Sequence, residues 1–165
     1  MYSLHKIPVS VLFIFLFFPA SGHDPFFPAA GAAESGMGFS CVMGPGFWSA
    51  FHNQALLPHQ KSAALGFCFQ NRFSISELGT RSAAFVMPAG NAGIGAVYRH
   101  FGYKDFMRHS AGLACGLKLS DKISAGIQTD FFAEKTAGDY NERRSLTFEA
   151  GMLITPSEKI SRVSI

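Results

Sequence analysis

The strictest pattern in the chain is an alternation of apolar residues with polar or small residues between Ser110 and Phe132. A strand points successive side chains to opposite faces, so this period of two predicts two antiparallel strands joined at Ser120-Asp121-Lys122. The apolar set comprises Ala111, Leu113, Cys115, Leu117, Leu119, Ile123, Ala125 and Ile127. Each run has about ten residues, the length at which a tilted strand crosses the hydrocarbon layer of a membrane.

Weaker alternation predicts four more full strands, and a seventh strand begins near Ile160. The four are Ala63 to Arg72, Arg81 to Met87, Gly93 to Arg99 and Leu146 to Ile154. We therefore expect an all-β fold for residues 62–165, with the strands of an antiparallel up-and-down transmembrane β-barrel. Bacterial single-chain barrels have at least eight strands, so we interpret these as an incomplete barrel, the open N-terminal half of a larger one.

The lengths of the connections support the same interpretation. Short connections are predicted at Pro88 to Asn91, Ser120 to Lys122 and Thr155 to Lys159. Longer, more charged connections are predicted at Phe73 to Thr80, His100 to His109 and Ala133 to Arg144. Short turns on one side and long loops on the other are typical of outer-membrane barrels.

The first 22 residues predict export. Lys6 precedes an unbroken apolar run from Val9 to Phe18, and small residues follow it up to Gly22. This is the pattern of a cleaved secretory signal peptide, and the run is too short for a membrane-spanning helix. Residues 23–61 have neither clean alternation nor a long helical stripe, so we expect an N-terminal plug or periplasmic segment there. The stretch from His23 to Phe51 is expected in the barrel interior or at its periplasmic mouth.

Composition narrows the class of protein without deciding it. Without Lys6, 13 basic and 11 acidic residues remain, a balance that does not indicate nucleic-acid binding. The chain is rich in Gly and Phe and poor in charge, as barrels are when small residues face inward and aromatic residues ring the interfaces. A soluble secreted β-sandwich or lipocalin-like binding module shares much of this composition and remains the alternative. The three cysteines lie far apart and predict neither a disulfide framework nor a metal site.

Motifs for chemistry are missing from the sequence. No nucleophile motif, Walker motif or dinucleotide fingerprint is present, so we expect no catalytic residue, no cofactor and no enzymatic activity. The pairs His52 with His59 and His100 with His109 lack a third ligand at a recognisable spacing, so we expect no metal site. The alternation points four polar residues inward, where they line a wet lumen or satisfy one another: Lys118, Gln128, Asp130 and Glu149.

The segment that begins Gly31-Ala32-Ala33-Glu34-Ser35-Gly36-Met37-Gly38, together with Asn53-Gln54-Ala55-Leu56-Leu57, resembles a known family of membrane proteins. These stretches are similar to the opening motif and the Asn-Pro-Ala-Gly-Leu motif of FadL-like outer-membrane barrels, including the PorV/PorQ-like group. The family-like positions are Gly31, Gly36, Gly38, Asn53 and Ala55. Gln54 and Leu56 depart from the family's Pro and Gly, and the family has about twice as many strands as are legible here.

The resemblance implies a location in the cell outer membrane and a role there. The implied roles are transport of hydrophobic small molecules, or protein secretion and surface attachment. Implied partners are outer-membrane lipid and lipopolysaccharide, with a hydrophobic ligand or secretion-system proteins as further candidates.

Overall fold

The computed structural model describes residues 30–38, 46–71, 74–136 and 142–155. The predicted signal peptide at 1–22 and the predicted seventh strand near Ile160 lie outside these residues. Within the described ranges, no helix has the length and hydropathy that crossing a membrane requires.

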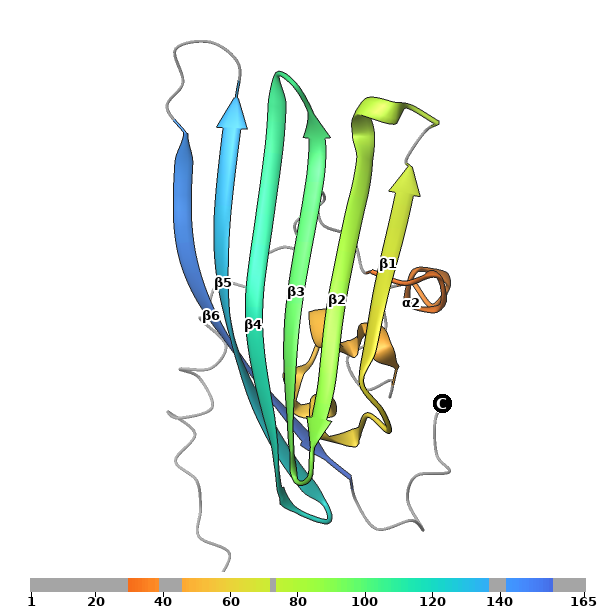
Figure 1. Ribbon diagram of the computed structural model, residues 1–165, viewed down its shortest axis with the longest axis vertical. Helices are drawn as coiled ribbons and strands as arrows, with labels where there is room; N and C mark the ends of the chain where they lie inside the picture. Colours follow the sequence, from red (N-terminus) through yellow and green to blue (C-terminus); the bar gives the residue numbers. More distant parts are fainter. Residues whose placement is uncertain (1–29, 39–45, 72–73, 137–141, 156–165) are drawn as a thin grey trace, which may run out of the picture.

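Six strands form one antiparallel sheet in which each strand pairs with its neighbours in sequence order (Figure 1). The strands are β1 (Ala64–Asn71), β2 (Gly79–Ala89), β3 (Ala92–Tyr103), β4 (Phe106–Ser120), β5 (Ile123–Thr136) and β6 (Arg143–Ile154). This confirms an all-β fold of six up-and-down strands. Among the described residues β1 and β6 do not pair with each other, so the sheet is open.

The two faces of the sheet differ in chemistry. The outward face carries large apolar side chains that are exposed, among them Phe67 at 76% and Phe148 at 77%. The inward face carries small or polar residues that are buried, such as Ser82, Gly95 and Gln128. Exposed and buried positions alternate along the middle of β4 and β5, as the sequence predicts.

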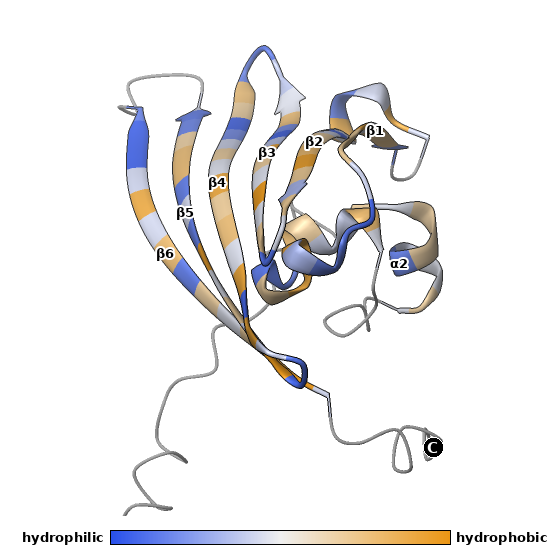
Figure 2. Cartoon of the chain, turned by 60° about the horizontal axis from the view of Figure 1, so that its bottom comes forward, coloured by the Kyte–Doolittle hydropathy of each residue, from blue (hydrophilic) through white to orange (hydrophobic). Residues whose placement is uncertain are grey.

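Short helices precede and interrupt the strands. They are α2 (Ala32–Gly36) and the 3-10 helices η1 (Phe47–Phe51), η2 (Gln54–His59) and η3 (Ser76–Leu78). The helix η2 contacts β2, β3, β4, β5 and β6, while η1 contacts β2 and β3. Residues 46–60, here called the covering segment, therefore lie on the concave side of the curved sheet (Figure 2).

The prediction of a long connection from His100 to His109 was wrong. β3 continues to Tyr103 and β4 begins at Phe106, so only Lys104 and Asp105 form the turn. The paired positions run through His100 and His109 up to Tyr103 with Phe106. Charged residues interrupt the apolar alternation at these strand ends, so the sequence pattern does not predict them. The strands still pair there, because backbone pairing does not require apolar side chains.

Gly102 permits this tight end of the β3–β4 hairpin. Its φ is +105°, and a Cβ there would collide with the carbonyl oxygen of Phe106. Gly102→Val should lower the free energy of unfolding by about 1–3 kcal/mol, the usual range for a strained backbone position. Urea unfolding measures the loss. Gly36→Ala is the matched control, because a Cβ at Gly36 meets nothing within 4 Å. Equal losses in the two variants would contradict the strained turn.

Candidate functional site

A floor of glycines on the inward face receives the covering segment. At Gly93 a Cβ would lie 2.5 Å from the backbone carbon of Leu57, and at Gly126 and Gly116 it would collide with the backbone of Gln54. Side chains of the segment fill the space over others: Phe47 over Gly66, Leu57 over Gly95 and Asn53 over Gly151. Because these positions lack side chains, the segment lies directly on the strand backbones.

A buried polar network holds the centre of this contact. The Gln54 amide nitrogen donates to Oε1 of Gln128 at 3.0 Å and to Oε2 of Glu149 at 3.5 Å. Gln128 in turn donates to both carboxylate oxygens of Asp130, each at 2.9 Å. Gln54, Gln128 and Asp130 are all buried, while Glu149 at the sheet edge is exposed. Arg99 attracts the carboxylates of Asp130 and Glu149. The polar groups of the network find hydrogen-bond partners within the protein, as buried polar groups require.

The end of η2 carries a second polar contact. The ring nitrogen Nε2 of His59 is 2.8 Å from the hydroxyl of Ser124, so the two share a hydrogen bond. Burial lowers the pKa of His59 below 6.5, and the positive charge of Lys118 lowers this pKa further. The neutral imidazole is therefore the form that suits this position.

Apolar contacts complete the attachment of the covering segment. Phe51 and Leu57 join Val86, Val97 and neighbouring alanines in one buried cluster, with Trp48 packed against it. Trp48 stacks on Phe51 with ring centroids 6.0 Å apart. On the other side of Phe51, the guanidinium carbon of Arg99 lies 4.2 Å from the ring centroid, a cation–π distance. The apolar cluster and the polar network are thus adjacent.

The structure separates the family-like residues into two groups. Asn53 and Ala55 lie at the start of η2, where the Asn53 side chain accepts a hydrogen bond from the Ala55 backbone at 3.1 Å. Gly31 has a φ of +100° and lies against Glu34 and Trp48. At Gly36 and Gly38 a Cβ would meet nothing within 4 Å. Asn53 and Ala55 therefore belong to the contact with the sheet, and the glycines precede it.

Of the four residues predicted to face inward, the structure brings Gln128, Asp130 and Glu149 together and places Lys118 near His59. Sequence reasoning missed the importance of Gln54 and His59. In the sequence analysis, Gln54 is only a departure from a family motif. His59 is only one of two histidines that lack a third metal ligand. The signal available for Gln54 was its place directly before the apolar run Ala55-Leu56-Leu57-Pro58.

The arrangement can hold a protein segment in place. Its carboxylates and amides are bound to one another, and the His59 imidazole is bound to the Ser124 hydroxyl. Within the described ranges no group of three His, Cys, Asp or Glu residues is placed to hold a metal ion. Comparison of the chain with protein-family models, with curated proteins and with solved structures gave no match. The resemblance to FadL-like barrels therefore stays a prediction.

A side chain added to the glycine floor should displace the covering segment. Gly126→Val should lower the free energy of unfolding by about 1–3 kcal/mol, the usual cost of overpacking. It should also shift the emission of Trp48, the single tryptophan, to longer wavelength. The control is Ala125→Val, because Ala125 faces outward on the same strand. Unchanged Trp48 emission in Gly126→Val would contradict the close contact.

The His59 contact should weaken in acid. Above pH 6.5 His59 is neutral in both states; as the pH falls from 6.5 to the lower folded pKa, only the unfolded state takes up the proton, so stability decreases. Lys118→Gln should raise the folded pKa and narrow this window, whereas Lys122→Gln in the β4–β5 turn should not. Titration of the His59 imidazole by NMR, with unfolding curves across the same pH range, measures both. An unshifted His59 pKa in Lys118→Gln would refute the role of that charge.

Proposed function

We propose that this chain supplies strands to a β-barrel of the outer membrane, with its outward face against lipid and its inward face toward the lumen. The observation that carries the proposal is the reversed polarity of the sheet. Its exposed face carries most of the large apolar side chains of the strands, and its covered face is built from glycine, alanine, valine and hydrogen-bonded polar residues. In water the hydrophobic effect favours the opposite arrangement, whereas in a membrane the exposed apolar face is the stable one.

Strand register supports a continuous apolar belt. The outward row Leu65, Phe85, Ala96, Leu113, Thr129 and Phe148 runs across all six strands. The next row on one side is Phe67, Ala83, Tyr98, Ala111, Phe131 and Leu146, and on the other side Met87, Ile94, Cys115, Ile127 and Ala150. None of these positions holds Asp, Glu, Lys, Arg or His.

The height of the belt fits the hydrocarbon layer. Along β5 the outward positions from Ile123 to Phe131 carry no charge and extend about 27 Å at the usual rise per residue. A strand tilt near 40° reduces this to about 20 Å, close to the roughly 25 Å band of outer-membrane barrels.

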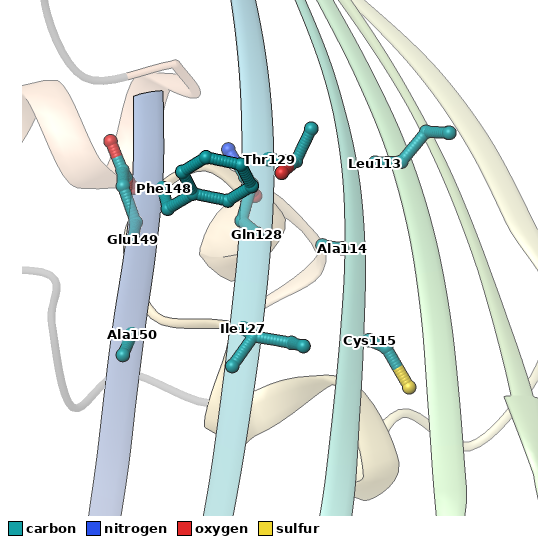
Figure 3. Close-up of a pocket in the computed structure, with 9 residues that line it drawn as sticks. All are labelled: Leu113, Ala114, Cys115, Ile127, Gln128, Thr129, Phe148, Glu149 and Ala150. Atoms are coloured by element: carbon teal, nitrogen blue, oxygen red, sulfur yellow. The ribbon is translucent and has the colours of Figure 1, made fainter. Parts of the chain in front are cut away.

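A shallow hollow of about 440 Å³ interrupts the belt over β4, β5 and β6. Leu113, Cys115, Ile127, Thr129 and Phe148 surround it, and the strands separate these side chains from the covering segment (Figure 3). The hollow is apolar and open, so acyl chains would fill it in a membrane.

In the proposed barrel, the covering segment is the part that lies inside. Residues 46–60 contact the inward face of five strands, so in a closed barrel they would occupy the lumen as a plug. Transport of hydrophobic small molecules and secretion or surface attachment of proteins are the roles that the family resemblance implies. Neither role requires the chain to be an enzyme.

A soluble β-sandwich or lipocalin-like module would need a layer of structure over the apolar face of the sheet. A β-sandwich buries its apolar faces between two sheets, and a lipocalin-like barrel buries them inside. The described strands form a single sheet, and the covering segment lies on the polar side of it.

Two outward positions on β5 provide a matched test. Thr129 lies in the middle of the apolar belt, and Ala133 lies in the row that contains His109 and Arg144. Thr129→Arg should make folding into the membrane less favourable by about 2–4 kcal/mol, and Ala133→Arg by no more than about 1 kcal/mol, because the cost of a cation falls toward the interface. The measurement is folding of the full chain into lipid vesicles across a urea series.

Folding of both arginine variants with equal stability would refute the lipid-facing belt. The wild-type chain folded and monodisperse in plain buffer would refute the membrane proposal altogether and favour the soluble module.

A further inference from the structure

A row of basic side chains crosses one end of the outward face. Cross-strand pairing places Arg81, His100 and His109 at one height on β2, β3 and β4, and Arg144 at the same height on β6. Phe69 and Ala133 complete the row on β1 and β5. At the usual spacing between strands, the distance from Arg81 to Arg144 is about 19 Å. The strand ends at this height are hydrophilic in Figure 2.

The basic row directly adjoins the aromatic side of the apolar belt. Phe67, Tyr98 and Phe131 lie in the next row, two residues closer to the middle of the sheet. The hydroxyl of Tyr98 shares a hydrogen bond of 2.7 Å with Nδ1 of His109, which leaves Nε2 of that ring for another partner. Aromatic rings at the edge of an apolar belt mark the headgroup level of a membrane. The basic row would therefore lie among headgroups.

Two observations suggest that the row takes an anion. The ring centroids of His100 and His109 are only 4.7 Å apart on adjacent strands of the row. A hollow of about 560 Å³ also opens beside His109 and Arg144, with Arg108 and Arg143 in its lining.

The acids nearby leave the row positive. Glu142 binds Arg144 at 2.9 Å, and Glu134, the acid in the lining of the hollow, binds Arg108 at 2.8 Å. On the outward face, Arg81, Arg144 and two histidines share this end of the sheet with one carboxylate, that of Glu142. Arg108, Glu134 and Arg143 alternate with them and point to the inward face. The excess of basic groups on a surface at headgroup depth complements an anion and disfavours a neutral ligand.

We propose that the basic row binds the phosphate groups of anionic lipids in the outer leaflet, such as the phosphates of lipid A. This inference rests on the proposed membrane location and adds the chemistry of the lipid partner. Arg81 and Arg144 supply fixed charge and planar donors suited to phosphate oxygens. His109 supplies the donor or acceptor at Nε2 between them. A row about 19 Å long spans several strands, so it contacts more than one phosphate.

The test uses the full chain folded in neutral detergent micelles and titrated with fluorescently labelled lipid A that carries two phosphates. The double variant Arg81→Gln with Arg144→Gln should raise the Kd by roughly tenfold or more, given the usual contribution of each surface cation. The matched control is Lys61→Gln with Lys122→Gln, which removes the same charge at the other end of the sheet. Its Kd should stay within about twofold of wild type, because charges beyond a Debye length are screened.

Three results would overturn the proposal. They are an equal loss of affinity in the control pair, equal binding of dephosphorylated lipid A by the wild type, and displacement of lipid A by equimolar inorganic phosphate. The last result would show a site for free phosphate. If the double variant does not fold, the two measurements on the wild type, with dephosphorylated lipid A and with inorganic phosphate, still decide the test. Failure of the wild type to enter micelles would instead refute the proposed membrane location, so the two failures are distinguishable.

Discussion

The contact between a glycine floor and the short helix η2 is the constraint on which the rest of this structure depends. The inward face could not accept residues 46–60 if Gly93, Gly116 or Gly126 carried a side chain, because the backbone of Leu57 and Gln54 occupies that space. Such close approach excludes water from the peptide groups and from Gln54. Buried amides and carboxylates are costly without partners, which is why Gln54, Gln128 and Asp130 form one connected network.

This arrangement reverses the usual distribution of residues in a domain. The covered side of the sheet is polar and small, and the apolar cluster around Leu57 and Phe51 is modest. Most of the large apolar side chains of the strands remain exposed on the outward face. Apart from that cluster, few large apolar side chains of the strands are buried among the described residues, so the outward face is a large exposed apolar surface.

The two ends of the outward face carry different kinds of residues. Near the β4–β5 turn the outward residues stay apolar to Leu119 and Ile123, whereas near the β3–β4 turn they change to arginine and histidine. The change takes place within two residues on several strands and at one height, since register aligns Arg81, His100 and His109. A boundary shared by strands far apart in sequence is a property of a surface, and in the proposed membrane location it would match the transition from acyl chains to headgroups.

From its local patterns the sequence predicts the strands, their order and the chemistry of their two faces, because the period of two is a local property of each strand, as in Leu113, Cys115 and Leu117. It also placed Gln128, Asp130 and Glu149 on the inward face. It could not give the strand ends at Tyr103 and Phe106, because charged residues pair as well as apolar ones. Only the tertiary structure decided that Gln54 and His59 bind Gln128 and Ser124, residues more than sixty positions away, since such contacts depend on where the covering segment lies on the sheet. Likewise, only register brought Arg81 and Arg144 to one height, because alignment across strands is set by backbone pairing and leaves no mark in any single stretch of sequence.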